Sequence, residues 1–191
     1  MTTDCLYNII GYMNTEMKNR LKNTVMNFRL PRYTELPTVG LYLEQVVKYI
    51  NGYMNQVNIA EITTSMISNY VKKGFIPSPQ KKQYYADQIA YLMFITITKN
   101  ILSLENIVEL FDLQKRTYSL PMAYDYFCCE LENMLQYVFG LKDEPEKNLG
   151  VTNTDTKDFF RNVIISVSHS IYLTSYFSEI KKEKALKGVF T

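Results

Sequence analysis

The feature that most constrains this chain is a proline-containing break between two stretches with helical periodicity near its middle. The segment Ile76-Pro77-Ser78-Pro79 cannot be helical, because proline lacks an amide hydrogen and its ring clashes with the preceding turn. Gly74 stands just before this segment, where a residue in the left-handed conformation can end a helix. The sequence therefore predicts a helix ending at Gly74, a loop, and a new helix beginning near Ala86.

Apolar residues at helical spacing predict an all-α fold for most of the remaining chain. Leu30-Pro31 and Leu36-Pro37 predict an extended link between the first two helices, because each proline disfavours helix at the residue before it. Thr63 or Thr64, and later Ser103, are placed to cap helices. The predicted helices cover residues 3–28, 38–54, 64–73, 119–139 and 155–182, with two more beginning near Ala86 and at Ser103, and a short two-stranded wing accompanies them.

Composition indicates a globular protein with a substantial core. Of the 191 residues, 47% are hydrophobic and 21% are charged, which excludes a disordered chain. Three cysteines make no disulfide framework, and neither a signal peptide nor an apolar run long enough to cross a bilayer is found. We therefore expect a cytoplasmic protein without a membrane partner. It divides into an N-terminal helical arm (1–29), a central domain (30–115) and a C-terminal helical region (116–191).

The net charge of +2 is too small to indicate nucleic-acid binding, so the distribution of charge must be considered. Residues 62–86 contain no acidic residue and four lysines. Such a segment can attract phosphates, while small polar side chains on the preceding helix can contact base edges. A merely solvated helix face is the alternative. The candidate DNA-binding residues are Thr64, Ser65, Ser68, Asn69, Tyr70, Lys72, Lys73, Lys81, Lys82, Gln83, Tyr84 and Tyr85.

Residues 62–113 resemble the DNA-binding domain of MerR-type regulators, a winged helix-turn-helix. The matching positions are Ile67, Tyr70, Gly74, Phe75, Pro77, Pro79 and Tyr85, followed by the helix start at residues 102–107. Over residues 28–115 the chain is similar to an uncharacterised family of MerR-like proteins from low-GC Gram-positive bacteria, known only as a domain of unknown function. The resemblance implies a transcriptional regulator that binds double-stranded DNA, with Met66 to Lys73 in the major groove.

Three positions depart from the MerR pattern. Ser68 stands where the recognition helix usually has arginine, Val71 stands where glutamate usually follows the tyrosine, and Gln83 replaces the usual wing arginine. Losing two arginines removes two strong donors to phosphate. A protein-interaction module that kept the winged-helix fold without binding DNA is therefore the alternative function, and a membrane-surface or structural role is a weaker third.

Other candidate sites are better explained by structure than by chemistry. Cys128 and Cys129 are adjacent, so on a helix their side chains point about 100° apart, and no metal-binding spacing accompanies them. His169, the only histidine, stands among small and apolar residues. No phosphate loop or catalytic motif is found. We expect neither an enzyme nor a cofactor or metal site.

Two further segments have open interpretations. Residues 15–32 carry five basic residues against one acidic residue, which predicts a solvated helix face or, less simply, an arm touching phosphates. The long last helix, with Phe160 and Phe177 among the residues along one side, fits either a homodimer contact or the core of a second domain. Residues 119–139 and 155–182 could enclose a pocket for an unknown small effector, although a tight core is the simpler prediction.

Overall fold

The computed structural model describes residues 15–146 and 154–186. Within the described residues the protein is 71% helical, with seven α-helices and a small two-stranded sheet. The prediction of a mostly helical fold is confirmed. The α-helices are α2 (Thr15–Met26), α3 (Leu43–Met54), α4 (Thr64–Lys72), α5 (Ala86–Thr98), α6 (Leu104–Thr117), α7 (Leu120–Val138) and α8 (Asp155–Leu186).

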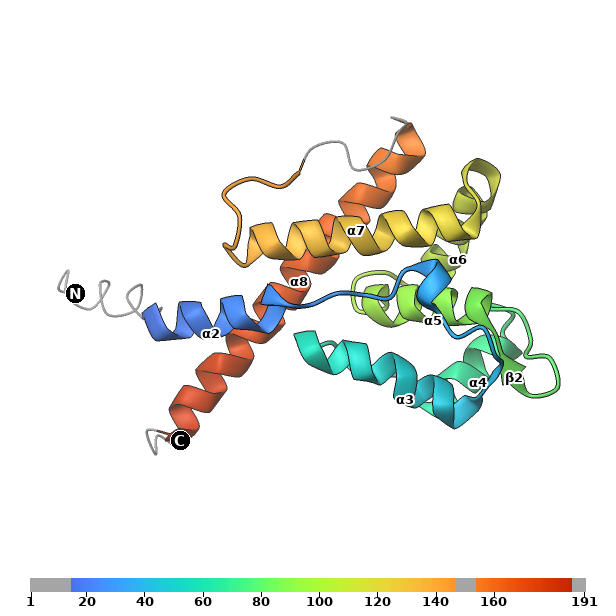
Figure 1. Cartoon of the computed structure of the whole chain (residues 1–191), viewed down its shortest axis with the longest axis horizontal. Coiled ribbons are helices and arrows are strands. Elements are labelled where there is room, and N and C mark those ends of the chain that lie inside the picture. The colour runs from blue at the N-terminus through green and yellow to red at the C-terminus, as the bar shows by residue number, and fades with distance from the viewer. Residues whose placement is uncertain (1–14, 147–153, 187–191) are drawn as a thin grey trace.

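Helix α5 lies at the centre of the molecule, between α3 on one side and α7 on the other, and α8 crosses behind (Figure 1). Ten of its thirteen residues are buried, and the hydroxyls of Thr96 and Thr98 donate to backbone carbonyls four residues earlier. Phe94 packs its ring against one phenylalanine from each of the three following helices, namely Phe111, Phe127 and Phe160. One hydrophobic core therefore runs through the arm, the central segment and the C-terminal helices.

Local capping signals place most helix boundaries where the sequence predicts them. The hydroxyls of Thr63 and Ser103 accept from backbone amides at the starts of α4 and α6, and Gly74 has φ of 74°. The helix predicted from Thr38 instead begins at Leu43. The residues before it are extended because they form strand β1 (Leu41–Tyr42), and Val39 is 69% exposed.

The last helix also differs from its prediction in detail. Helix α8 continues to Leu186, beyond the predicted end near residue 182. Phe160 is buried as predicted, whereas Phe177 is 56% exposed. Helix α2 is the described part of the first predicted helix, and residues 3–14 of that prediction lie outside the described residues.

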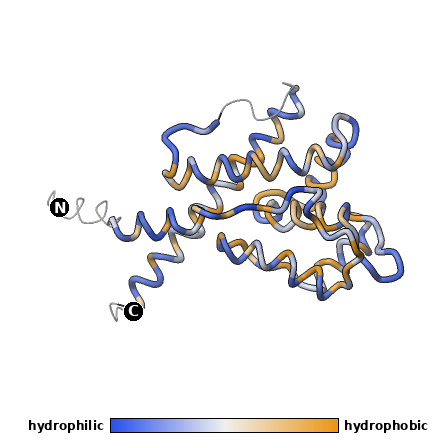
Figure 2. Tube along the Cα trace, viewed as in Figure 1, coloured by the Kyte–Doolittle hydropathy of each residue, from blue (hydrophilic) through white to orange (hydrophobic). Residues whose placement is uncertain are grey.

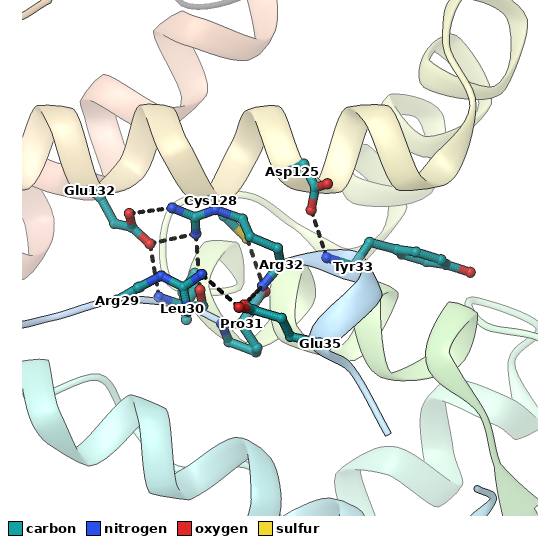
Figure 3. Close-up of polar contacts among 9 residues, drawn as sticks. All are labelled: Arg29, Leu30, Pro31, Arg32, Tyr33, Glu35, Asp125, Cys128 and Glu132. Atoms are coloured by element: carbon teal, nitrogen blue, oxygen red, sulfur yellow. Dashed lines mark hydrogen bonds and ion pairs between the residues drawn. The ribbon is translucent and has the colours of Figure 1, made fainter. Parts of the chain in front are cut away.

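Residues 28–36, here called the strap, lie along α7 and are extended except for one 3-10 turn at Tyr33–Glu35 (Figure 3). The Arg32 guanidinium donates to both carboxylate oxygens of Glu132, at 2.7 and 2.6 Å, and the Leu30 amide donates to the same side chain at 2.9 Å. Asp125, two turns earlier on α7, accepts from the Tyr33 amide at 2.6 Å. The amides of Leu30 and Tyr33 have no backbone acceptor nearby in the chain, and these two carboxylates supply their hydrogen bonds instead.

We expect Glu132→Ala to lower the free energy of unfolding by about 2–3 kcal/mol, because it leaves the half-buried Arg32 guanidinium and the Leu30 amide without their acceptor. Urea unfolding followed by circular dichroism measures the change. Glu109→Ala, at an exposed position on α6, is the control and should stay within about 0.5 kcal/mol of the parent. Equal effects of the two substitutions would contradict this role of Glu132.

Candidate nucleic-acid interface

Helices α3 and α4 are joined by a linker whose geometry is held by one buried amide. The Asn51 side chain donates to the Ile62 carbonyl and accepts from the Ile62 amide, both at 2.9 Å. Asn51 is 9% exposed and Ile62 is 1% exposed, so water cannot replace these bonds easily. The start of α4 is therefore tied directly to the last turn of α3.

Helix α4 has one polar exposed face and one buried apolar face. Ser65, Ser68, Asn69 and Lys72 are all exposed, and their spacing places them together along one side of the helix. Ile67 faces the core from the opposite side with no exposed surface. The structure thus brings together the four residues predicted to contact base edges.

The loop after α4 ends in a two-residue turn that carries Lys81 and Lys82 at its tip. Gln80 and Gln83 exchange backbone hydrogen bonds of 3.0 and 2.8 Å, and the two lysines between them have φ of 48° and 66°. Positive φ at both central residues is the type I′ geometry that suits a tight hairpin, although it costs about 1 kcal/mol per residue without glycine. Both lysines are exposed, in a hydrophilic loop that extends past the helices (Figures 1 and 2).

The hairpin pairs with strand β1, which was not predicted from the sequence. Strand β2 (Gln83–Tyr84) runs antiparallel to β1, with Leu41 opposite Tyr84 and Tyr42 opposite Gln83. A small two-stranded sheet is therefore present as predicted, but one of its strands comes from the segment before α3.

Gly40 lies immediately beside this sheet. A Cβ atom at position 40 would stand 2.7 Å from the Gln83 Cβ and 2.9 Å from the Tyr85 ring, closer than such atoms approach. A glycine here is required by the close approach of the two segments.

Gln88 anchors the other side of the loop. Its amide nitrogen donates to the Pro77 carbonyl at 3.0 Å, and its carbonyl oxygen accepts from the Tyr85 amide at 2.9 Å. The side chain is 6% exposed, so this single buried amide joins the loop to the first turn of α5. Sequence reasoning missed it, although a glutamine at the third position of a helix is a known capping signal.

Two of the predicted DNA contacts are corrected by the structure. Tyr70 is only 3% exposed and Tyr84 only 4%, because both rings complete the core between α4 and the sheet, and burial raises the pKa of both phenols. Neither ring is available to lie along a phosphate backbone. Tyr85 remains accessible at 37%, and its hydroxyl donates to the Gln83 side chain at 3.4 Å. Thr64, at the start of α4, is half-buried.

The lysines of this region are not neutralised by acids of the described chain. Lys72, Lys73, Lys81 and Lys82 are exposed, and within residues 15–146 and 154–186 none of them forms an ion pair. Lys73 lies 5.7 Å above the Phe75 ring, a cation–π contact that leaves its charge in place. The positive charge of residues 62–86 is therefore free to attract an anionic partner.

The first acid after this segment, Asp87, accepts a hydrogen bond from the Tyr33 hydroxyl of the strap. Burial, with a smaller contribution from this carboxylate, raises the pKa of Tyr33 to about 12. Tyr33 thus links the strap to the first turn of α5, beside the hairpin.

The basic residues of the arm have a different environment. Arg20 pairs with Glu179 and Glu183 of α8, and Arg29 pairs with Glu35. Arg32 pairs with Glu132, as described above. Arg20 thus ties α2 to α8 and Arg32 ties the strap to α7, while the polar face of α2, with Lys18 and Arg20, is exposed as the favoured interpretation of a solvated helix face predicts.

The cysteines and the histidine form no evident reactive site. Cys128 is fully buried and donates to the Pro31 carbonyl at 3.7 Å, and burial raises the pKa of its thiol to about 12. Burial also raises the pKa of Cys129, while His169 is exposed on α8. Cys5 lies outside the described residues. In the part of the chain that the structure describes, no three potential ligands are grouped as a metal site would require.

The sequence matches the family model described as a domain of unknown function (DUF1836) over residues 31–127, just over half of the chain. The protein belongs to this family, which confirms the domain-of-unknown-function part of the resemblance. The matched segment begins in the strap and ends in α7, so it contains α3, α4, the hairpin and α5 entire. Searches of curated proteins and of solved structures found no match.

None of the helices among the described residues combines the length and the apolar character that crossing a membrane requires.

We expect Gly40→Ala and Gly52→Ala to have opposite effects on the urea midpoint. The first forces the hairpin away from β1 and should lower the free energy of unfolding by about 1–3 kcal/mol. The second places a methyl group in open space on helix α3 and should raise it by about 0.5–1 kcal/mol. A neutral Gly40→Ala variant would show that the sheet does not constrain the hairpin.

Proposed function

We propose that this protein is a sequence-specific regulator of transcription that binds double-stranded DNA through a MerR-like winged helix. One observation carries the proposal: an exposed polar helix, α4, and a tight turn whose two lysines form no ion pair with any described residue lie at the same end of the molecule (Figure 1). Buried amides hold both sides of this unit, Asn51 before α4 and Gln88 after the hairpin. Pre-organised polar groups of this kind lose little entropy on binding.

The proposed contacts follow from exposure. Helix α4 enters the major groove, where Ser65, Ser68, Asn69 and Lys72 meet base edges, because an α-helix fits that groove and amides and ammonium groups can distinguish bases. Lys73, Lys81, Lys82 and Tyr85 contact phosphates and fix the register of the protein on the duplex. Thr64 and Gln83, both half-buried, border these two sets.

The alternative is a protein-interaction module that uses the same surface. It is favoured by Ser68 and Gln83, which occupy positions where MerR-type regulators carry arginine. Dependence on salt separates the two, because binding through phosphates weakens steeply as salt is added, whereas binding through apolar contacts does not.

We expect Lys81→Glu combined with Lys82→Glu to abolish binding of the full chain to a pool of random-sequence duplexes in a low-salt shift assay. The milder pair Lys81→Gln and Lys82→Gln should retain weak binding and reduce the slope of log affinity against log salt by about 2, one unit per lost phosphate contact.

The matched control reverses two exposed charges elsewhere, with Lys181→Glu and Lys184→Glu near the end of α8. It carries the same change in net charge but should keep most of the binding. Undiminished binding by the hairpin variants would refute this placement of the DNA. Absence of binding by the parent chain at low salt would favour the interaction module.

We also propose that the protein acts as a homodimer through α8. Leu173 and Phe177 are one turn apart on α8 and are 52% and 56% exposed, an uncommon arrangement for large apolar side chains unless they meet a partner.

The parent chain should sediment as a dimer in analytical ultracentrifugation, and Leu173→Glu with Phe177→Glu should sediment as a monomer. Because both side chains are exposed, the monomer should keep its helical circular dichroism spectrum. Lys181→Glu, on the same helix, should remain dimeric. A monomeric parent chain would exclude this assembly.

A further inference from the structure

A cavity of about 450 Å³ lies between the α3–α4 linker, the C-terminal end of α5 and the middle of α8. Its volume is within the range of pockets that hold small organic molecules. It is distinct from the predicted effector pocket, which would lie between residues 119–139 and 155–182, because no residue of α7 lines it.

The lining of the cavity is apolar on one side and hydrogen-bonding on the other. Ile59, Ile97 and Ile171 contribute apolar surface and are each at most 7% exposed. Ser170 and Thr174, one turn apart on α8, contribute hydroxyl groups. Such a lining suits a ligand with an apolar body and a polar end.

Among the described residues that line the cavity, Glu61 is the one with a charged side chain. Its carboxylate accepts a hydrogen bond from the Asn55 amide at 2.9 Å, which orients it beside the cavity. The nearby ammonium group of Lys99 donates to the backbone carbonyl of Glu61 at 3.0 Å rather than to its carboxylate. The exposed carboxylate therefore keeps acceptor capacity for a cationic ligand, while Lys99 stays bound to the backbone carbonyl.

We infer that this cavity binds a small organic amine in its cationic form, with the ammonium group at Glu61 and the apolar body against the isoleucines. A charge-assisted hydrogen bond to a carboxylate is stronger than a neutral one, so charge should decide which ligands enter.

Binding at this site would also act on α4. Glu61 directly precedes Ile62, whose backbone is held by Asn51, and the next residue caps α4. An amine that contacts Glu61 and Ile59 stabilises the linker in one conformation and thereby the start of α4. The consequence for DNA affinity rests on the proposed function, whereas the binding itself does not.

The test is titration of the full chain, without DNA, with phenethylamine, tryptamine and hexylamine, each compared with its alcohol and carboxylate analogues by NMR chemical-shift changes. We expect at least one amine to bind, its alcohol to bind more weakly, and its carboxylate not to bind. Glu61→Gln should lower the affinity for the amine about tenfold and leave the affinity for the alcohol unchanged. Equal binding of amine and carboxylate, or no binding of any amine, would overturn the inference.

A second pair of variants tests the location without removing the charge. Ser170→Leu fills the cavity from α8 and should abolish binding, whereas Ser166→Leu, one turn earlier and exposed outside the lining, should not. Both variants place leucine at an incompletely buried position of one long helix, so both should fold. Binding that survives Ser170→Leu would place the amine elsewhere.

The effect on DNA is measured separately, by repeating the low-salt shift assay with the amine at saturation. A changed DNA affinity in the parent chain and an unchanged one in Glu61→Gln would support the coupling. An unchanged affinity in both would overturn the coupling while leaving the binding site intact. Failure of the parent chain to bind DNA would refute the proposed function alone.

Discussion

The contacts of Phe94 hold the rest of the structure together. This ring lies 4.8 Å from Phe127, 5.4 Å from Phe111 and 6.3 Å from Phe160, so a single side chain of α5 meets α7, α6 and α8. Aromatic rings bury large areas and prefer tilted arrangements such as these, which makes their contacts both strong and directional. Because α6, α7 and α8 all pack against this one residue, its contacts fix the position of α5 relative to these three helices.

The two ends of α5 have different surroundings. Near the N-terminal end, Gln88 binds the Pro77 carbonyl and thereby positions the hairpin with its two lysines. Near the C-terminal end, Ile97 lines the cavity next to α8. A helix of thirteen residues spans about 20 Å, so the hairpin and the cavity are separated by a rigid, buried element. The α3–α4 linker, by contrast, touches the cavity through Glu61 and reaches α4 within three residues. A signal from the cavity to α4 would travel through the linker.

Features that depend on neighbouring residues could be predicted from the sequence, and features that depend on distant ones could not. The caps at Thr63 and Ser103 and the end at Gly74 are local, and all three stand as predicted. Strand β1 pairs with a segment about 40 residues later, so its own sequence reads equally well as the start of a helix. The bonds from the strap to α7 join residues 92 to 102 positions apart.

In the candidate site, too, local features could be predicted from the sequence and long-range contacts could not. The exposed face of α4 follows from helical spacing and was predicted in full, together with the loop that presents Lys81 and Lys82. Tyr70 lies in the apolar stripe of α4, which predicts burial, and in the MerR pattern, which predicts a DNA contact. Its ring is buried, so the apolar stripe is the better guide to its position. The bonds from Asn51 to Ile62 and from Gln88 to the Pro77 carbonyl could not be predicted, because an amide in a helix gives no indication of which distant backbone it will meet. An amide among apolar positions was nevertheless a signal, since burying it without partners would be costly.

The distribution of charge gives the strongest reason to treat α4 and the hairpin as the functional surface. From the sequence, two basic regions compete, since residues 15–32 have more basic residues than residues 62–86. The structure separates them: Arg20, Arg29 and Arg32 are each paired with a glutamate, which cancels much of the field of the arm. The four lysines between residues 72 and 82 have no such partners within the described chain. A protein whose net charge is only +2 therefore gathers four lysines without an acidic partner in the described chain on α4 and the hairpin. Placing both lysines of the turn at positive φ keeps this charge at the hairpin tip at a cost in stability.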